Sequence, residues 1–538
     1  MCIEFGGTLK RLDVVKHGQI SEIIHNSNNL FEGVGSVHAV RYHSLHADPH
    51  GADDIEPLAW ADDGLENGRV LMGAAHKHRP FWGVQYHPES VRTEGGGIDV
   101  VRNFWTAAQR WNSDRRRFTK PWNVSLNATF GSPWPKLPSS LPTSTSARLS
   151  VLTESMELPS VNVAQICETL KVHDESSPFV LLESAAAPGR FSILTCSSPG
   201  STQFVYNRRD DFLTSTTDGK EPVRIQLSNR DIWSWLATFM SARRATGGTS
   251  SVPFWGGLVG ILGYELAAQN LDVQILDKQN GTPHPDVNLL YVERSVVLDH
   301  QSGTVYIQSL IPDDQAWIAT TRAQICSLGT ADAICSENDD LTEQKARVFI
   351  PDKASYLSGI QRCIDFLHSG DSYELCLTAQ TRVQVPRSAS SWSRYNALRK
   401  KNPAPYSAYI RLSPTTFLSS SPERFLSYSA PPHSLCQLRP IKGTVPKTVC
   451  KTRAQAEEAL VGSTKEVAEN LMIVDLIRHD LHGVVGDHVE VKQFCGVEEY
   501  KTVWQMVSVI EGQLPETCSP ESQQQLGWEV LRRSLPPG

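Results

Sequence analysis

The spacing of hydrophobic and polar positions changes along the chain and divides it into regions. Residues 1–111 alternate short apolar runs with turns rich in Gly and His, and they end in the amphipathic stretch VVRNFWTAAQRW. Short strands followed by an amphipathic helix predict an α/β domain. Residues 112–150 include the basic run DRRRFTK and continue into SPWPKLPSSLPTSTS. Because Pro and Ser at this density resist packing into a core, this stretch is predicted to be a linker.

Two further globular regions follow the linker. Residues 151–330 carry apolar stretches such as FVLLESA and FWGGLVGILGYEL, whose glycines allow other backbones to approach beside the strands. They predict a mixed α and β domain. Residues 345–538 begin with ASYLSGIQRCIDFLHSG, which has the spacing of a helix, and continue into a predicted strand that includes TRVQV.

The composition excludes several classes of function. Of the 538 residues, 51 are basic and 58 are acidic, so the net charge of -7 gives no basic field for a nucleic acid backbone. The eleven cysteines include no C-x-x-C pair, which favours a reducing, cytoplasmic setting over a zinc ribbon or a disulfide framework. There is no apolar run long enough for a membrane helix and no signal-peptide pattern at the start. We therefore expect a cytoplasmic protein that binds neither nucleic acid nor membrane.

The segment GVQYHPES places two polar residues behind an apolar strand. His87 and Glu89 are separated by one residue, so both side chains can project from the strand end into one cleft. In a Cys-His-Glu triad the imidazole removes the thiol proton, and the carboxylate orients the imidazole and stabilises its charged form. A histidine before a proline is also a common turn residue, so these two residues alone leave both interpretations open.

Residues 1–111 as a whole resemble the class I glutamine amidotransferases. GVQYHPES is preceded by HGQIS and VRYHSLHA, which match that family in order. The resemblance implies a flavodoxin-like α/β fold, glutamine as a substrate, and catalytic roles for His87 and Glu89. The family's nucleophile elbow, G-x-C-x-G, does not occur in this sequence, and Cys2 has no preceding Gly, so we assign Cys2 to structure. We expect an amidotransferase remnant that is inactive and poorly folded.

The chain beyond residue 152 resembles the large subunit shared by anthranilate synthase and aminodeoxychorismate synthase. The resemblance implies chorismate as the substrate and an α+β fold of layered β-sheets with helices, like that of anthranilate synthase component I. Seven motifs match in order, and so many ordered matches are hard to obtain by chance. They are LLES (181–184), GGLVGILGYE (256–265), GDSYELCLT (370–378), NPAPYSAYI (402–410), SSSPERFL (419–426), RPIKGT (439–444) and STKEVAENLMIVDLIRHDL (463–481).

Two carboxylates in STKEVAEN suit a bound cation. Ser463 and Glu466 have the spacing of a capping box, and Glu466 and Glu469 stand at i and i+3 on one face of the predicted helix. A solvated, charged helix face would have the same spacing. The following run LMIVDLI predicts a largely buried helix, on which unpaired carboxylates are costly. The resemblance implies that both glutamates bind Mg2+.

Lys442 in RPIKGT is the most discriminating residue. From the sequence alone it is either a surface cation or a nucleophile whose pKa is lowered by its surroundings. Within the family, aminodeoxychorismate synthases carry lysine there and anthranilate synthases usually carry alanine. The resemblance implies that Lys442 attacks a ring carbon of chorismate and that Glu423 is the general acid or base for the departing hydroxyl. The alternative for Glu423 is a salt bridge to Arg424 or Lys442.

The same resemblance assigns three residues to the substrate pocket, namely Thr378, Gly443 and Thr444. It also places Leu182, Glu183 and Ser184 where relatives bind tryptophan, either as a feedback ligand or as a buried structural one. Where relatives often have a histidine pair, this chain has Trp504 and Gln505, so we expect no catalytic histidine there.

The lysine at position 442 implies the function of an aminodeoxychorismate synthase, which converts chorismate and glutamine (or ammonia) to 4-amino-4-deoxychorismate and glutamate for para-aminobenzoate and folate biosynthesis. Anthranilate synthase is the alternative enzyme. Relatives continue into a Gly-Ala-Pro-Lys turn and a second set of Mg2+ carboxylates, which this sequence lacks. We therefore expect the chain as given to be inactive, and the alternative of another class is a non-catalytic chorismate-binding or scaffold protein. The oligomeric state stays open.

Overall fold

The structure is a computed structural model, and it divides the chain into two compact units. It describes residues 1–27, 29–117, 149–186, 189–196, 198, 200–227, 231–268, 284–328, 346–386, 390–431, 434–514 and 520–536. Unit 1 comprises Met1–Pro135, Ala346–Gln384 and Glu457–Leu476, and unit 2 comprises Lys136–Lys345, Val385–Ala456 and Ile477–Gly538. Most of the linker expected at 112–150 lies outside the described residues.

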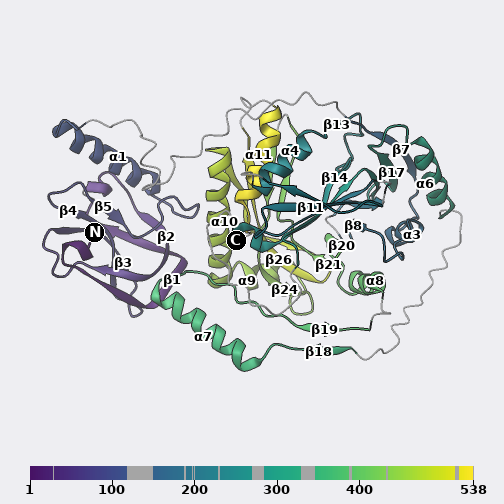
Figure 1. The fold of residues 1–538 in the computed structure, drawn as a ribbon. Coiled ribbons are helices and arrows are strands. Elements are labelled where there is room, and N and C mark those ends of the chain that lie inside the picture. Colours follow the sequence, from purple (N-terminus) through teal and green to yellow (C-terminus); the bar gives the residue numbers. More distant parts are fainter. Residues whose placement is uncertain are drawn as a thin grey trace. The chain divides into compact units, whose positions relative to one another are not determined.

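Unit 1 is built on a five-stranded antiparallel sheet in the order β2-β1-β3-β4-β5. The strands are β1 (Thr8–His25), β2 (Val37–Asp48), β3 (Ile55–Asp62), β4 (Arg69–His76) and β5 (Trp82–Val84). Helix α1 (Gly97–Asp114) lies beside this sheet (Figure 1) and contacts the short helix η2 (Asn29–Phe31). Phe31, Leu58 and Met72 are fully buried in its core.

Cys2 belongs to a second small core of this sheet. It precedes helix η1 (Ile3–Phe5) and packs with Ile55, Leu71 and Ala74. Burial raises the pKa of the Cys2 thiol, which keeps it protonated and unreactive. This environment agrees with the structural role expected for Cys2.

Three further helices contribute residues to unit 1. Helix α7 (Lys353–Ser369) begins where the Asp352 carboxylate accepts a hydrogen bond from Ser355 N at 2.7 Å and ends at Gly370, whose φ of 82° suits a left-handed cap. The other two, α9 (Arg453–Leu460) and α10 (Thr464–Val485), continue into unit 2. Strands β18 (Arg347–Phe349) and β19 (Arg382–Gln384) flank α7 and pair antiparallel. The helix and the following strand predicted in this region are both present.

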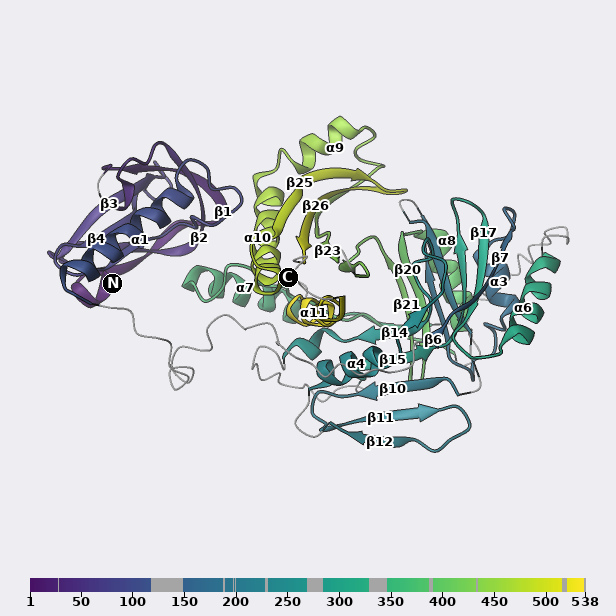
Figure 2. The ribbon, with the colours of Figure 1, turned by 90° about the horizontal axis from the view of Figure 1, so that it is seen from above.

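Unit 2 contains three larger sheets. One has seven strands in the order β21-β20-β8-β9-β16-β17-β7, and a second has five in the order β12-β11-β10-β15-β14. The third is centred on β26, which pairs with β23, β24 and β25, while β22 pairs with β23. Figure 2 shows β10, β11 and β12 as neighbouring antiparallel strands of the second sheet.

The strand bounds of unit 2 are as follows. The seven-stranded sheet contains β7 (Leu152–Glu157), β8 (Phe179–Glu183), β9 (Phe191–Cys196), β16 (Arg294–Asp299), β17 (Thr304–Ser309), β20 (Tyr406–Leu412) and β21 (Thr415–Ser421). The second sheet contains β10 (Thr202–Tyr206), β11 (Phe212–Thr217), β12 (Val223–Gln226), β14 (Gly257–Leu262) and β15 (Val287–Val292). The third contains β22 (Leu426–Tyr428), β23 (Leu435–Leu438), β24 (Ile441–Pro446), β25 (Val489–Glu499) and β26 (Val503–Gln513). A parallel pair joins β6 (Leu149–Ser150) to β13 (Ala245–Thr246).

Helices cover the sheets of unit 2 and close its cores. They are α3 (Val163–Thr169), α4 (Ile232–Ser241), η4 (Tyr264–Ala267), α6 (Gln315–Leu328), α8 (Ser391–Lys401) and α11 (Pro520–Arg533). Trp392 and Tyr395 of α8 pack against Tyr409 of β20 with ring centroids 5.4 and 5.6 Å away. In both ribbon views α4 and α11 lie side by side (Figures 1 and 2). Among the described residues no helix is long and apolar enough to cross a membrane.

Candidate functional site

His87 and Glu89 form a hydrogen-bonded pair in unit 1. His87 Nδ1 lies 2.8 Å from Glu89 Oε1, and the His87 backbone is held by its N–H donating to Val40 O at 2.9 Å. Both side chains are exposed, with fractions of 43% and 72%, so a substrate can reach the imidazole. This geometry is that of a base and its orienting carboxylate.

A network that the sequence analysis missed links this pair to helix α10. The carboxylate of Asp475 accepts hydrogen bonds from Tyr42 Oη at 3.1 Å, Ser90 Oγ at 2.5 Å and Val91 N at 3.2 Å. The Tyr42 ring meets the His87 ring edge to face at a centroid distance of 4.9 Å. Burial, and then the charge of Asp475, raise the pKa of Tyr42, so its hydroxyl stays a donor. Asp475 of α10 therefore binds both β2 and the segment that follows His87.

Glu466 and Glu469 lie on the first turns of the same helix. The Glu466 N–H donates to Ser463 Oγ at 3.4 Å, as the capping-box spacing predicts. Lys465 Nζ lies 3.6 Å from Glu466 Oε1 and 3.0 Å from Glu469 Oε1, and the two carboxylates, Glu469 more strongly, raise the pKa of the lysine. The two carboxylates thus create a negative potential that already attracts the ammonium group of Lys465. Leu471 and the three residues after it are buried, which confirms the buried helix expected here.

These two carboxylates make an incomplete but suitable magnesium ligand set. Among the described residues no group of three or more Asp, Glu, His or Cys side chains converges as a metal cage. Magnesium is usually held by one or two protein carboxylates, with water and substrate oxygens completing an octahedron. Half-buried carboxylates, 26% and 35% exposed, fit that mode of binding.

Glu423 and Lys442 lie close together in unit 2. The Glu423 carboxylate accepts a hydrogen bond from Ile441 N at 3.2 Å, which places it beside the backbone that carries Lys442. Burial of the carboxylate raises the pKa of Glu423, although the Ile441 N–H and the charge of Lys442 act in the opposite direction. A carboxyl group with a raised pKa and a neighbouring amine is the pair that an acid and a nucleophile require.

Gly443 and Thr444 follow Lys442 on β24. Gly443 has a φ of 93°, a conformation that favours glycine, and it lies at an irregularity in the pairing of β24 with β26. Gln505 of β26 donates from Nε2 to Thr444 Oγ1 at 3.2 Å, and its Oε1 is buried without a partner. Trp504 donates from Nε1 to Cys450 O at 2.9 Å, which gives it a structural role.

Thr378 lies in unit 1, in an exposed segment between α7 and β19. The predicted residues are therefore distributed over both units. Glu466, Glu469, His87, Glu89 and Thr378 belong to unit 1, whereas Glu423, Lys442, Gly443 and Thr444 belong to unit 2.

The LLES segment has a buried carboxylate that is fully engaged. Glu183 accepts hydrogen bonds from Tyr395 Oη at 2.8 Å, Arg399 Nε at 2.9 Å and Arg399 Nη2. Ser184 donates from Oγ to Phe191 O at 2.7 Å, and Leu182 is half-buried on β8. The partners on α8 were not recognised from the sequence, because the contact joins residues 216 positions apart.

Two family models together match most of the chain. Residues 1–107 match the class-I glutamine amidotransferases, and residues 179–538 match the chorismate binding enzymes. These matches confirm an amidotransferase segment followed by chorismate-binding sheets and helices. The five described strands of the unit 1 sheet pair antiparallel, which differs from the parallel sheet expected of a flavodoxin-like fold.

Two similar proteins that align over nearly the whole chain are both called aminodeoxychorismate synthase. The chain is 33% identical to an aminodeoxychorismate synthase of Saccharomyces cerevisiae, with all of this chain and 73% of the yeast protein aligned. It is 32% identical to an aminodeoxychorismate synthase of Streptomyces griseus, over 97% of this chain and 70% of that protein. A crystal structure of anthranilate synthase component I from Streptococcus pneumoniae is 20% identical with a TM-score of 0.47, covering 64% of this chain and 76% of that one. The chain therefore belongs to the chorismate-binding enzymes that are fused to a class-I glutamine amidotransferase, the family of the aminodeoxychorismate synthases.

Proposed function

We propose that this protein converts chorismate and glutamine to 4-amino-4-deoxychorismate and glutamate, in para-aminobenzoate and folate biosynthesis. The observation that carries the proposal is the pair in unit 2, where Glu423 lies against the backbone of Ile441 and the charge of Lys442 acts on its carboxyl. The names of the full-length relatives support the same reaction.

In this proposal Lys442 is the nucleophile and Glu423 the general acid. The neutral amine of Lys442 bonds to one ring carbon, the ring double bonds shift, and the hydroxyl on another ring carbon leaves as water with a proton from Glu423. The raised pKa of Glu423 favours the protonated carboxyl that this step needs. Ammonia then bonds to the carbon that lost the hydroxyl and releases Lys442.

Glu466 and Glu469 are proposed to hold Mg2+. When bound, the ion would neutralise a carboxylate of chorismate, which lowers the cost of holding a dianion in the site. Binding of the ion by these glutamates would displace Lys465 from its present contacts. A direct check is Mg2+ titration followed by the chemical shift of the Lys465 Nζ group, with Glu466→Gln as the variant expected to weaken binding and Lys492→Ala as the control.

In the amidotransferase half we propose that His87 is a base and that Glu89 orients it. Because the sequence has no G-x-C-x-G elbow to supply the thiol, the nitrogen used by the second half is proposed to come from glutamine or from ammonia in solution. Thr378, Gly443 and Thr444 are proposed as substrate-binding residues. Leu182, Glu183 and Ser184 are proposed to adjoin a tryptophan-like ligand, and because Glu183 is engaged by Arg399, the polar contact falls to Ser184.

A cytoplasmic location is also part of the proposal. Eight cysteines whose side chains the structure describes are free thiols, which persist in a reducing compartment.

The deciding experiment identifies the product. The purified protein is incubated with chorismate, Mg2+ and glutamine, and the products are separated and identified by mass spectrometry. We expect 4-amino-4-deoxychorismate from the wild type and a large loss of it in Lys442→Ala, with Lys401→Ala as the control for an exposed lysine. Formation of fluorescent anthranilate instead would assign the alternative enzyme, and chorismate binding without turnover would favour a non-catalytic role.

A further inference from the structure

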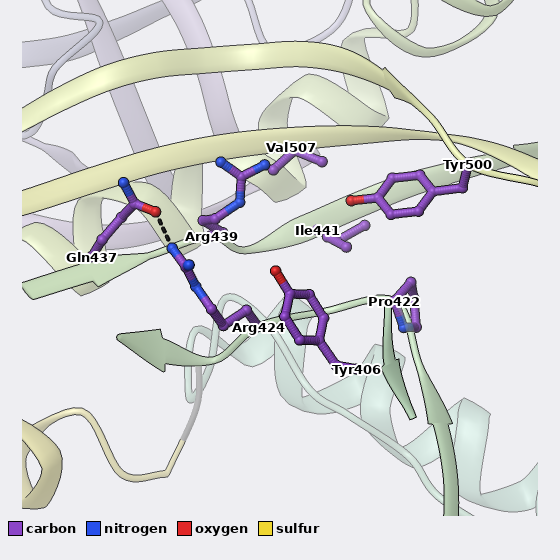
Figure 3. Close-up of a pocket in the computed structure, with 8 residues that line it drawn as sticks. All are labelled: Tyr406, Pro422, Arg424, Gln437, Arg439, Ile441, Tyr500 and Val507. Carbon is purple, nitrogen blue, oxygen red and sulfur yellow. Dashed lines mark hydrogen bonds between the residues drawn. The ribbon is translucent and has the colours of Figure 1, made fainter. Parts of the chain in front are cut away.

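The pocket at Arg424 adjoins the proposed chorismate site. Figure 3 shows Pro422 and Ile441 among the residues that line it. They are the chain neighbours of Glu423 and Lys442. The feature that the proposed function does not explain lies in unit 1, where helix α7 exposes a stripe of apolar side chains.

The apolar residues of α7 have the spacing of a coiled coil. Leu357 is followed by apolar residues at i+3, i+7 and i+10, namely Ile360, Ile364 and Leu367. These are the a and d positions of a heptad, and we call the four residues the α7 stripe. The first three are 52%, 37% and 39% exposed, and Leu367 is half-buried. Apolar residues gathered on one exposed helix face mark a surface that binds a partner.

The contacts of α7 within its own chain lie away from this stripe. Gly359 is buried on another side of the helix, where an added Cβ would lie 3.1 Å from Leu377 Cδ2. At the end of the helix, a Cβ on Gly370 would lie 2.9 Å from Leu45 Cδ1 of β2. Unit 1 therefore holds α7 by one side and by its end, and leaves the stripe exposed.

Two opposite charges continue the heptad beyond the stripe. Lys353 stands four residues before Leu357, and Asp371 stands four residues after Leu367, and both are exposed. The Asp371 N–H donates to Phe366 O at 3.1 Å, which fixes the aspartate at the end of the helix. A helix N-terminus favours an anion and a C-terminus favours a cation, so each charge lies at the less favourable end of its own helix. An antiparallel partner helix would bring the favourable charge to each end.

We propose that the α7 stripe binds the α7 stripe of a second copy of this chain, antiparallel and around a two-fold axis. In the register that matches a with d positions, Ile360 lies against Ile364 of the partner. Leu357 lies against Leu367 of the partner in the same register. One surface patch then serves both copies, as a two-fold dimer requires. This contact goes beyond the proposed function, because none of these residues takes part in amination.

The same register accounts for the charges and brings two thiols to the axis. Lys353 of each copy meets Asp371 of the partner, so the ion pair forms twice. Cys363 occupies a g position next to the axis, and g positions flank the apolar contact of two paired helices. Its thiol is free and half-buried. The two Cys363 thiols of a dimer are therefore expected to lie near each other.

The first test measures the oligomeric state of the full chain and needs no turnover. Stable interfaces bury about 1,200–2,000 Å2 in total, and one helix stripe offers less, so a dissociation constant of about 10–100 μM is expected. Sedimentation velocity should show a monomer at about 1 μM and mainly a dimer at about 200 μM. A monomer at both concentrations, or large aggregates without a discrete dimer, would overturn the proposal.

A substitution in the stripe locates the contact. Ile364→Glu places a charge in the apolar contact and should leave a monomer at about 200 μM. Ile98→Glu on α1, where the isoleucine is 60% exposed, is the matched control and should dimerise like the wild type. A dimer that is lost in Ile98→Glu but kept in Ile364→Glu would place the contact on α1 and overturn the proposal.

A charge exchange tests the antiparallel register, and it decides the matter should Ile364→Glu fail to fold. Lys353→Asp and Asp371→Lys each set like charges against each other twice, so each should weaken the dimer about tenfold. The variant with both substitutions restores opposite charges and should recover the wild-type dissociation constant. A double variant that is as weak as the single ones would refute this register.

A crosslink between thiols tests the position of the axis. A short bismaleimide joins two cysteines because each thiol adds across one maleimide double bond. At about 200 μM we expect a crosslinked dimer whose joined peptides both contain Cys363. Cys363→Ser should abolish this crosslink, whereas Cys376→Ser, which removes an exposed thiol elsewhere in unit 1, should keep it. A dimer that is crosslinked through Cys376 and not through Cys363 would contradict the proposal.

Discussion

Removing the Asp475 carboxylate is predicted to loosen β2 from helix α10. Three donors meet this carboxylate, namely Tyr42 Oη, Ser90 Oγ and Val91 N, at 3.1, 2.5 and 3.2 Å. Hydrogen bonds to a charged group contribute about 1.5–3 kcal/mol each, and bonds that share one acceptor are not additive. We therefore expect Asp475→Ala to cost about 3 kcal/mol and Tyr42→Phe about 1.5 kcal/mol.

The assay is native-state hydrogen exchange read by mass spectrometry. A chain with several sheets does not unfold in one step, so local opening free energies in β2 and α10 are more informative than a single melting temperature. Tyr356→Phe on α7, a tyrosine that is 40% exposed, is the control and should change neither opening energy.

A double-mutant cycle decides whether the contact itself is responsible. If Tyr42 and Asp475 share a hydrogen bond, the double variant should be less destabilised than the sum of the single ones by about 1 kcal/mol. Additive costs, or an Asp475→Ala variant that exchanges like the wild type, would refute the contact.

Three further predictions follow from ionisable groups. Burial raises the pKa of Asp480 from 3.8 to about 6, so the charged carboxylate opposes folding as the pH rises through this range. In urea unfolding, Asp480→Asn should therefore be more stable than the wild type by at most about 3 kcal/mol at pH 7 and no more stable at pH 4. An equal gain in stability at both pH values would contradict this. Arg399→Met leaves Glu183, which is 3% exposed, without its cation and should lower the free energy of unfolding in urea by about 3–5 kcal/mol. Adding Glu183→Gln to this variant should recover part of the lost stability. No recovery would show that the ion pair is not the cause. Because Glu423 must donate a proton and burial raises its pKa, kcat should fall as the pH rises through that pKa. Glu423→Gln should lower kcat by about 100-fold or more and should remove this fall from the pH profile of kcat. An unchanged pH profile would exclude Glu423 as the acid.

Local patterns predicted the parts of this structure that depend on neighbouring residues. The helical spacing of residues 353–369, the cap at Ser463 and the buried run after Glu469 are set by contacts within a few turns. The His87 and Glu89 side chains meet because one residue separates them in a turn, which the Ser90 N–H closes on His87 O at 3.3 Å.

The contacts that could not be predicted from the sequence are those between distant segments of the chain. Asp475 is 433 residues from Tyr42, and the run LMIVDLI does not indicate which residues this aspartate contacts. The lining of the pocket at Arg424 comes from several strands whose pairing is a tertiary outcome. Pairing over such separations is fixed by the packing of whole sheets, which short sequence patterns do not encode.

The most direct test of the account is to look for chorismate bonded to Lys442. The purified protein is mixed with chorismate and Mg2+ without glutamine or ammonia and is then denatured, and the masses of the protein and of its peptides are measured. The account predicts a mass increase of one chorismate minus one water, located on Lys442, which disappears when ammonia is added. Amination of chorismate by a Lys442→Ala variant at the wild-type rate, with no adduct in the wild type, would contradict it.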